Sequence, residues 1–313
     1  MAIKTTPEKN RFPLGYWAAL ICVAVIAAPA KVSAQTQCHG MQIHAHRGAH
    51  THPENSLSGA LASMQGDWDG LEVDVQMLSD GTPVLHHDQQ LGRTTSLSKR
   101  SAAEIGIEAW AEIRLRDRKG RLTSEPPPTL RDMLLAIKES SKTVNLEIKL
   151  PYRSCDAVRR TISELTENRP GGQWFLSAID RQHLRCARRF DPNGYLGLVV
   201  LDPQSAARAH PRLRQQASGI APPKIDGAYL ERLVQEVGRP LGLHIDANTL
   251  EANPQLLVSA HQKRLSIFTY SMQGNLVHSD ILSKIANKEK FFPTGAALLH
   301  KSEDRRNAPS PRR

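Results

Sequence analysis

Short apolar runs alternate with helical stretches along most of the chain, and this alternation limits the folds open to it. Such an order is typical of a parallel sheet covered by helices, and the number of repeats over residues 39–300 favours one (β/α)8 TIM barrel over two smaller domains. The expected strands cover residues 41–45, 70–78, 82–86, 143–150, 174–179, 195–201, 226–230, 242–247 and 265–270. The expected helices include 56–64, 130–140, 156–167, 182–189 and 254–263.

Two segments depart from this alternation. Residues 93–125 are dense in charge and carry little strand pattern, so we expect a small insertion there, at the mouth of the barrel. Residues 301–313 are polar and rich in charge, which predicts a disordered tail.

The N-terminus has the order of a secretory signal peptide. Basic residues precede an uncharged run over 12–30, and small residues follow up to Ala34. This predicts a signal peptide over 1–34, cleavage after Ala34, and export to the periplasm or beyond the cell. An uncleaved membrane anchor is the alternative, because the apolar run is long for a signal. Export permits a disulfide, for which Cys155 and Cys186 are the candidates.

The basic charge balance points to anionic partners without choosing among them. The formal charge is +10, and removal of residues 1–34 lowers it to +7, because four basic residues and one acidic residue are lost. The Lys and Arg residues are spread among acids, without interleaved aromatic residues, so we expect no nucleic-acid binding. We expect a small-molecule substrate and no stable protein partner.

Acidic residues occupy alternate positions of two expected strands. Glu72 and Asp74 share one face of GLEVDV, while Glu147 and Lys149 share one face of VNLEIKL. If the intervening apolar residues meet the helices, the carboxylates face the barrel axis, where their mutual repulsion calls for a positive partner. Three oxygen ligands without a Cys suit a hard cation, Mg²⁺ or Ca²⁺. Buried salt bridges to Arg47 and Lys149 are the alternative.

Seven of the 13 histidines lie between His39 and His87. His46 ends the first expected strand and His87 the third, on the side of a barrel where active sites form. Two such histidines can serve as general base and general acid near neutral pH. We expect His44 to be a core residue one layer deeper, and His86 to point away from its neighbour.

Arg47 directly follows the first of these histidines and can present a two-pronged contact to a phosphate or carboxylate. A divalent cation, Arg47, Lys149 and two histidines around one pocket suit a phosphodiester, because the positive groups neutralise charge that develops on the phosphoryl oxygens.

Several short motifs occur in the order and spacing of a known family. They are HRG (46–48), PEN (53–55), EVDV (72–75), SDGTPVLHHD (79–88), LGRTT (91–95), PTL (128–130) and NLEIK (145–149). Together they resemble the glycerophosphodiester phosphodiesterase family. The resemblance implies a TIM-barrel hydrolase that cleaves deacylated phospholipids, such as glycerophosphocholine or glycerophosphoethanolamine, to glycerol 3-phosphate and an alcohol.

Eight positions of this chain match site residues of that family. They are His46 and His87 as the acid/base pair, Glu72, Asp74 and Glu147 as metal ligands, and Arg47, Lys149 and Glu54 as phosphate or substrate contacts. The second half of the chain departs from the family. LSIFTYSM (265–272) replaces a Trp-Thr-x-Asn strand, and FFPTGAALL (291–299) lacks the closing Thr-Asp-x-Pro, which leaves the alcohol specificity open.

Other functions remain as alternatives. A phospholipase-like relative, of the sphingomyelinase D or phosphatidylinositol phospholipase C type, uses a similar barrel and histidine pair on intact lipid. An exported protein that binds phosphodiesters without cleaving them would not need a proton-transfer pair. The sequence also leaves open which histidine is the base, and whether water or a glycerol hydroxyl of the substrate attacks first.

Overall fold

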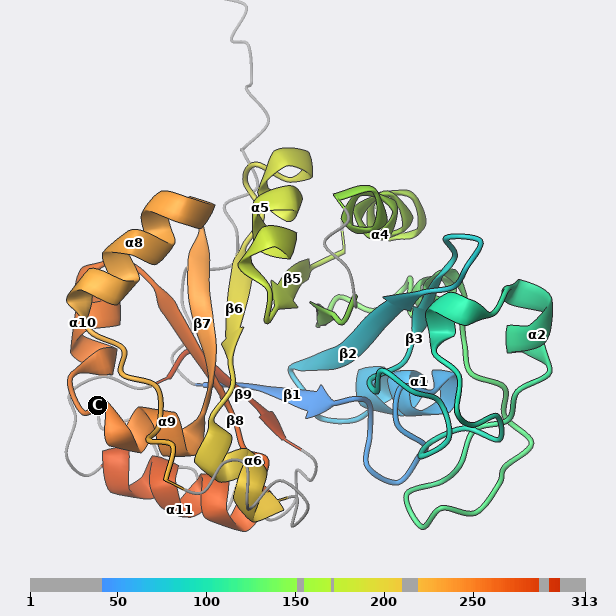
Figure 1. Cartoon of the computed structure of the whole chain (residues 1–313), viewed down its shortest axis with the longest axis horizontal. Helices are drawn as coiled ribbons and strands as arrows, with labels where there is room; N and C mark the ends of the chain where they lie inside the picture. The colour runs from blue at the N-terminus through green and yellow to red at the C-terminus, as the bar shows by residue number, and fades with distance from the viewer. Residues whose placement is uncertain (1–40, 151–154, 170–171, 210–218, 287–292, 299–313) are drawn as a thin grey trace, which may run out of the picture. The chain divides into compact units, whose positions relative to one another are not determined.

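The computed structural model describes residues 41–150, 155–169, 172–209, 219–286 and 293–298 (Figure 1). The expected signal peptide over 1–34 and the expected tail over 301–313 lie outside these residues, as does Cys38. Within the described part of the chain, no helix is both long enough and apolar enough to cross a membrane.

The described residues form a closed barrel of eight parallel strands. Its strands, in spatial order, are β1 (Gln42–His46), β9 (Gly295–Leu298), β8 (Ser266–Tyr270), β7 (Leu241–Asp246), β6 (Leu196–Val200), β5 (Trp174–Ala178), β4 (Thr143–Ile148) and β2 (Gly70–Met77). Pairing of β1 with β2 closes the circle, with His46 opposite Glu72. This confirms the predicted (β/α)8 fold class.

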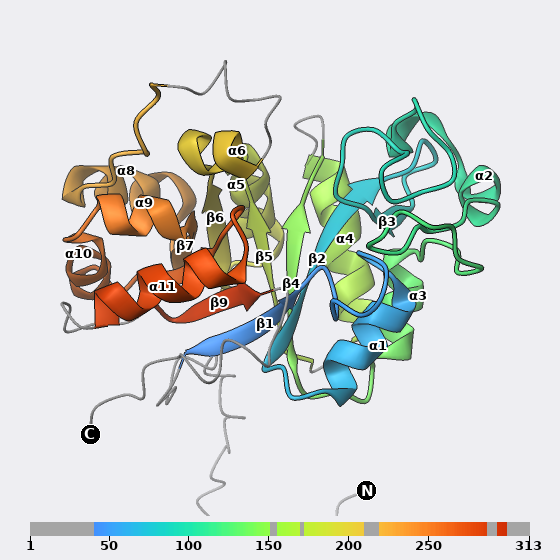
Figure 2. The same ribbon diagram turned by 90° about the horizontal axis from the view of Figure 1, so that it is seen from below.

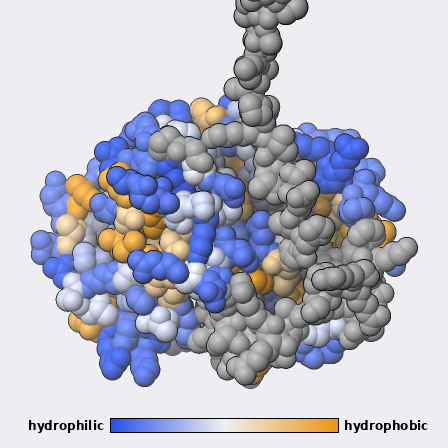
Figure 3. Space-filling view, turned by 180° about the vertical axis from the view of Figure 1, so that it is seen from behind, coloured by the Kyte–Doolittle hydropathy of each residue, from blue (hydrophilic) through white to orange (hydrophobic). Residues whose placement is uncertain are grey.

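Helices cover the outside of the barrel, as Figure 2 shows. They are α1 (Leu57–Gln65), α3 (Leu130–Ala136), α4 (Cys155–Asn168), α5 (Arg181–Phe190), α6 (Pro203–Ala209), α8 (Gly227–Val237), α9 (Ala247–Ala252), α10 (Leu256–Gln262) and α11 (Asn275–Ala286). The apolar residues of β2, including Val73 and Val75, are buried against this layer. Their alternation with Glu72 and Asp74 therefore turns both carboxylates to the barrel interior. On the face seen in Figure 3, polar residues surround small apolar groups.

One expected strand is wrong, and another forms outside the barrel. Residues 226–230 begin helix α8: Asp226 accepts a hydrogen bond from the Tyr229 N–H, and Leu230, Leu233 and Val237 are buried along one face. This helical spacing was missed because the apolar run at 227–230, GAYL, is too short to distinguish a helix from a strand. The eighth barrel strand is instead β9, whose Gly-Ala-Ala-Leu sequence contains no β-branched or aromatic residue and so gives little strand signal.

The other correction concerns the expected strand at 82–86. The observed β3 (Pro83–Leu85) runs antiparallel to β2, with Val75 opposite Leu85, and is not one of the barrel strands. His87 therefore does not end a barrel strand. The antiparallel pairing of β2 and β3 brings the chain back toward the acids, so that His87 lines the cavity. The His86 N–H donates to the Asp74 carbonyl and attaches this segment to β2.

The segment between β3 and α3 has a small apolar core of its own. It contains the 3-10 turn Ala102–Glu104 and helix α2 (Ile107–Ala111). Trp110 is buried in a cluster with Ile105 and Ile113, and His86 packs against the Trp110 ring with 6.3 Å between ring centroids. The segment lies beside the carboxyl ends of β1 and β2 (Figure 2).

An aromatic layer fills the barrel toward the amino ends of its strands. The ring centroids of His44 and Phe268 are 5.6 Å apart, and those of Phe175 and Tyr195 are 5.0 Å apart. Four strand glycines make room for these rings, because a Cβ at any of them would collide with a neighbouring ring: Gly70 with His44, Gly197 with His244, Gly242 with Tyr195 and Gly295 with Phe268. Burial lowers the pKa of His44 to about 4, so this layer is uncharged at neutral pH.

Cys155 and Cys186 form a disulfide between α4 and α5, the pairing that the sequence suggested, with 5.1 Å between their Cα atoms. The bond closes a loop of sequence separation 31. We expect Cys186→Ser to lower the free energy of unfolding by about 3 kcal/mol, because the disulfide restricts the unfolded chain. Urea unfolding with and without reductant measures this. Reductant should destabilise the wild type but not the variant, and an unchanged wild type in reductant would contradict the expectation.

A candidate metal and phosphodiester site

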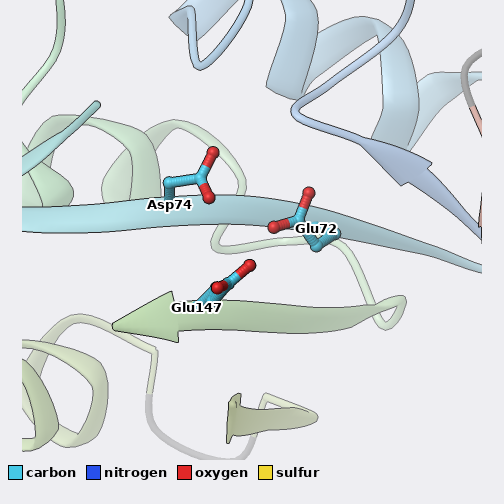
Figure 4. A group of neighbouring side chains, drawn as sticks. All are labelled: Glu72, Asp74 and Glu147. Atoms are coloured by element: carbon cyan, nitrogen blue, oxygen red, sulfur yellow. The ribbon is translucent and has the colours of Figure 1, made fainter. Parts of the chain in front are cut away.

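Three carboxylates meet inside the barrel, level with the carboxyl ends of β1 and β4. Glu72 and Asp74 come from β2 and Glu147 from β4, as Figure 4 shows, and one ligand oxygen of each lies within 4.8 Å of the others. The register explains this convergence, because Asp74 is paired with Glu147 on the neighbouring strand. Glu72 and Asp74 are almost completely buried, at 3% and 1% exposure.

Two cations neutralise part of this negative charge. Lys149 Nζ lies 2.7 Å from Glu147 Oε1 and 3.6 Å from Asp74 Oδ1, and Arg47 Nε lies 3.4 Å from Asp74 Oδ2. Arg47 is shared, because its Nη1 also donates to Glu54 at 3.0 Å. The buried salt bridges considered from the sequence are therefore present, but they leave Glu72 without a Lys or Arg side chain as an ion-pair partner among the described residues.

For this reason the pKa values of Glu72 and Asp74 are shifted in opposite directions. Burial and the charges of Asp74 and Glu147 raise the pKa of Glu72 well above its ordinary value. Burial acts in the same direction on Asp74, but His87, Lys149, Arg47 and the Asn55 hydrogen bond outweigh it and lower the pKa of Asp74.

The donor set fits a hard divalent cation. Glu72 Oε1 and Asp74 Oδ1 are buried and accept no hydrogen bond from the described residues, so each has a free lone pair in the interior. Buried carboxylate oxygens without donors are costly unless a cation binds them. The three residues predicted as metal ligands are thus brought together in an arrangement that could bind Mg²⁺ or Ca²⁺ through oxygen.

The turn after β1 directs a backbone N–H at one of the acids. Arg47 has φ 57° and Gly48 φ 87°, and the Arg47 N–H donates to Glu72 Oε2 at 2.9 Å. A Cβ at Gly48 would come within 3.0 Å of the Gly59 backbone, so this close approach requires glycine. The left-handed backbone at Arg47 is the kind of strain that persists at functional sites, where the surrounding structure holds it.

Two neutral side chains that the sequence analysis did not select hold this centre together. Asn55 Nδ2 donates to Asp74 Oδ2 at 2.8 Å, and its Oδ1 accepts from the Asp74 N–H at 3.0 Å. Gln76 Nε2 donates to the backbone carbonyls of His86 and Asp88, which positions the segment that carries His87. Signals for both were present, since Asn55 belongs to the PEN motif and Gln76 extends the alternation of polar residues in β2.

The two predicted catalytic histidines line the same cavity as the acids. His46 Nε2 is 3.8 Å from Glu72 Oε2, and burial together with Arg47 lowers the pKa of His46. His87 Nδ1 lies 2.7 Å from Asp88 Oδ1. This contact fixes the ring and leaves Nε2 as the nitrogen available to a ligand. Asp88 was not selected from the sequence, although it ends the SDGTPVLHHD motif.

Glu54 lies at the centre of a group of arginines. Arg93 donates to both of its oxygens, at 2.8 and 3.0 Å, and also to Asp88 at 2.6 Å through Nε. Burial opposes ionisation of Glu54, but Arg93 and Arg47 outweigh it and lower the pKa of Glu54 to about 2. Glu54 is therefore an anion that orders guanidinium groups. Arg93 and Arg118, which the sequence analysis did not select, border the same space.

A cavity of about 570 Å³ joins these groups. Of the eight predicted site residues, seven line it: His46, Arg47, Glu54, Glu72, His87, Glu147 and Lys149. Asp74 lies behind them, in contact with Arg47 and Lys149. The opposite wall comes from the ends of β6 and β8 and includes Leu201, Tyr270 and Met272.

The model of the glycerophosphoryl diester phosphodiesterase family matches residues 46–290, which is most of the chain. The protein belongs to this family. A glycerophosphodiester phosphodiesterase of Caldanaerobacter subterraneus is 26% identical over 185 residues, which cover 57% of this chain and 74% of that protein. Glycerophosphodiester phosphodiesterase 1 of Bos taurus is 30% identical over 128 residues, 38% of each chain.

A solved structure has the same barrel. It is a phosphodiesterase of Oleispira antarctica in complex with the product sn-glycerol 3-phosphate, with a TM-score of 0.67 and 19% identity, covering 85% of this chain and 96% of that one. At this identity the likeness establishes the fold.

The charge balance at Glu72 leads to a test of the metal site. We expect Glu72→Gln to leave the metal-free protein as stable as the wild type or about 1 kcal/mol more stable at pH 7, because it removes one of three converging negative charges. Stabilisation of the wild type by added Mg²⁺ or Ca²⁺ should be lost in the variant. Urea unfolding in chelator and in each metal measures both effects.

Glu164→Gln, in α4 where the carboxylate pairs with Arg131 and does not line the cavity, is the matched control and should keep the response to metal. A Glu72→Gln protein that is stabilised by metal as strongly as the wild type would show that Glu72 is not a ligand.

Proposed function

We propose that the protein hydrolyses glycerophosphodiesters to glycerol 3-phosphate and an alcohol, with Mg²⁺ or Ca²⁺ held by Glu72, Asp74 and Glu147. The observation that carries this proposal is the meeting of three interior acids with His46 and His87 at one cavity. Family membership supports the reaction class. The glycerol 3-phosphate bound to the Oleispira antarctica relative supports the identity of the product.

Arg47 and Lys149 bind the phosphodiester in this proposal. Both line the cavity and both border the acids, so a phosphate next to the cation would lie within reach of each. Arg47 can offer two parallel N–H donors, whereas Lys149 supplies a point charge. The bound cation would supply further positive charge against the phosphoryl oxygens.

His46 and His87 transfer the protons. One histidine accepts the proton of the attacking oxygen, from water or from a glycerol hydroxyl of the substrate, as that oxygen bonds to phosphorus, and the other gives a proton to the alcohol oxygen as its bond to phosphorus breaks. Where the glycerol hydroxyl attacks, water then opens the cyclic phosphate to glycerol 3-phosphate, and the two histidines exchange roles. The Asp88 contact holds the His87 ring in one orientation throughout. Gln76 donates hydrogen bonds to the His86 and Asp88 carbonyls and so holds the backbone on both sides of His87 in place.

Loss of either histidine tests this role. We expect His46→Ala and His87→Ala each to lower kcat for glycerophosphoethanolamine hydrolysis about 100- to 10,000-fold, the usual range for a general acid or base. Chelation should abolish turnover, and readdition of Mg²⁺ or Ca²⁺ should restore it. Release of glycerol 3-phosphate, followed with a coupled dehydrogenase, measures the rate.

His261→Ala, at an exposed position of α10, serves as the control and should keep the wild-type rate. A His46→Ala enzyme with full activity would contradict the proposed mechanism. Full activity in chelator would contradict the proposed role of the metal.

We also propose that the chain is exported, with cleavage after Ala34. The order of basic, apolar and small residues in 1–34 supports this, and the Cys155–Cys186 disulfide suits an oxidising compartment. N-terminal sequencing of the protein recovered from a cell envelope extract should begin at Gln35. A mature chain that keeps residues 1–34 would favour the uncleaved anchor instead.

A further inference from the structure

A tight turn in the segment between β3 and α3 holds one arginine against the cavity. The Asp117 N–H donates to the Arg121 carbonyl, the Gly120 N–H donates to the Asp117 carbonyl, and Asp117 Oδ1 accepts from the N–H groups of Lys119 and Arg121. These bonds fix the backbone of the turn. Lys119 and Arg121 are exposed, whereas the side chain of Arg118 is only 15% exposed and lines the cavity.

Arg118 is held in place without a full set of partners. Its Nε donates to the His52 carbonyl at 3.2 Å. Its Nη1 is 3.7 Å from Glu54 Oε1, beyond hydrogen-bond distance, because Arg93 and Arg47 already donate to the Glu54 oxygens. Its Nη2 is buried and donates to none of the described residues. The guanidinium group therefore has donors left for a ligand.

The positive charge of Arg118 is also poorly balanced. Three arginines surround the single carboxylate of Glu54, while Arg93 has Asp88 and Arg47 has Asp74 as a second acid. Arg118 has no second acid among the described residues. Burial and the charges of Arg47 and Arg93 lower the pKa of Arg118, although Glu54 opposes them. An anion at this position would relieve the repulsion.

An anion bound at Arg118 would occupy a different position from the phosphate that is cleaved. Arg47 stands between the two places: it contacts Asp74 of the metal centre on one side and Glu54 on the other, and Arg118 lies beyond Glu54. Among the described lining residues, Tyr270 is the one phenol or indole ring, so the cavity has no aromatic cage for a quaternary ammonium group.

We propose that Arg118 binds an anionic group, a carboxylate or a phosphate, carried by the alcohol part of the substrate, so that the enzyme prefers glycerophosphodiesters with an acidic head group. The proposal rests on the function proposed above. It assigns head-group selectivity to the segment between β3 and α3 and leaves the reaction at the metal centre as described.

Two matched pairs of substrates test it. Glycerophosphoserine differs from glycerophosphoethanolamine by a carboxylate, and glycerophosphoinositol 4-phosphate differs from glycerophosphoinositol by a phosphate. We expect the wild type to have a higher kcat/KM for the acidic member of at least one pair, and that pair identifies the anion. Arg118→Gln should lower the ratio of kcat/KM within this pair about tenfold, mainly through KM, because a charge-assisted hydrogen bond is lost.

The matched control is Arg121→Gln, which removes a charge of the same turn from a side chain that is 73% exposed. It should keep the wild-type ratio, and Arg118→Lys should restore part of it. Thermal unfolding of each variant checks that the substitution has not destabilised the protein as a whole.

The outcomes separate the two proposals. If all four diesters are hydrolysed and Arg118→Gln leaves both ratios unchanged, the inference about Arg118 is wrong and the proposed function stands. If the wild type hydrolyses none of them, the proposed function is wrong. Calorimetric binding of the four diesters, in wild type and Arg118→Gln, then tests the anion site without turnover, and equal wild-type affinities within both pairs would overturn it.

Discussion

Repulsion among Glu72, Asp74 and Glu147 is the interaction around which the site is arranged. Register alone brings the three acids within ligand distance, because Asp74 and Glu147 are direct partners on adjacent strands. The surrounding groups compensate the charges of these acids unequally. Asp74 receives two cations and a reciprocal pair of hydrogen bonds from Asn55, whereas Glu72 receives a backbone N–H and a distant histidine. This inequality is what suits the centre to a divalent cation.

Most of the candidate metal site could be predicted from the sequence because it depends on local rules. Alternation along a strand places Glu72 and Asp74 on one face whatever the rest of the fold, and the same holds for Glu147 and Lys149. The large barrel strands were recognisable from their apolar residues for the same reason. Strand β9 was not, since its sequence of one glycine, two alanines and a leucine forms a strand only when β1 and β8 supply hydrogen bonds on both sides.

The remaining features depend on contacts between segments far apart in the chain. His87 reaches the site through an antiparallel hairpin, which the sequence pattern cannot distinguish from a barrel strand. Arg118 is one of many basic residues in a charged stretch, and only the folded turn shows that it faces inward while Lys119 faces solvent. The role of Glu54 as an organiser of arginines likewise appears only when Arg47, Arg93 and Arg118 are seen around it.

The aromatic layer beneath the acids has a consequence for the shape of the cavity. Rings from β1, β5, β7 and β8, together with Tyr195, pack in the space that four strand glycines leave, and the histidines of the layer carry no charge at neutral pH. His244 belongs both to this layer and to the lining of the cavity, so the rings form part of the floor beneath the site. A ligand that rests on this floor shares the cavity with Arg93 and Arg118, which line it as well.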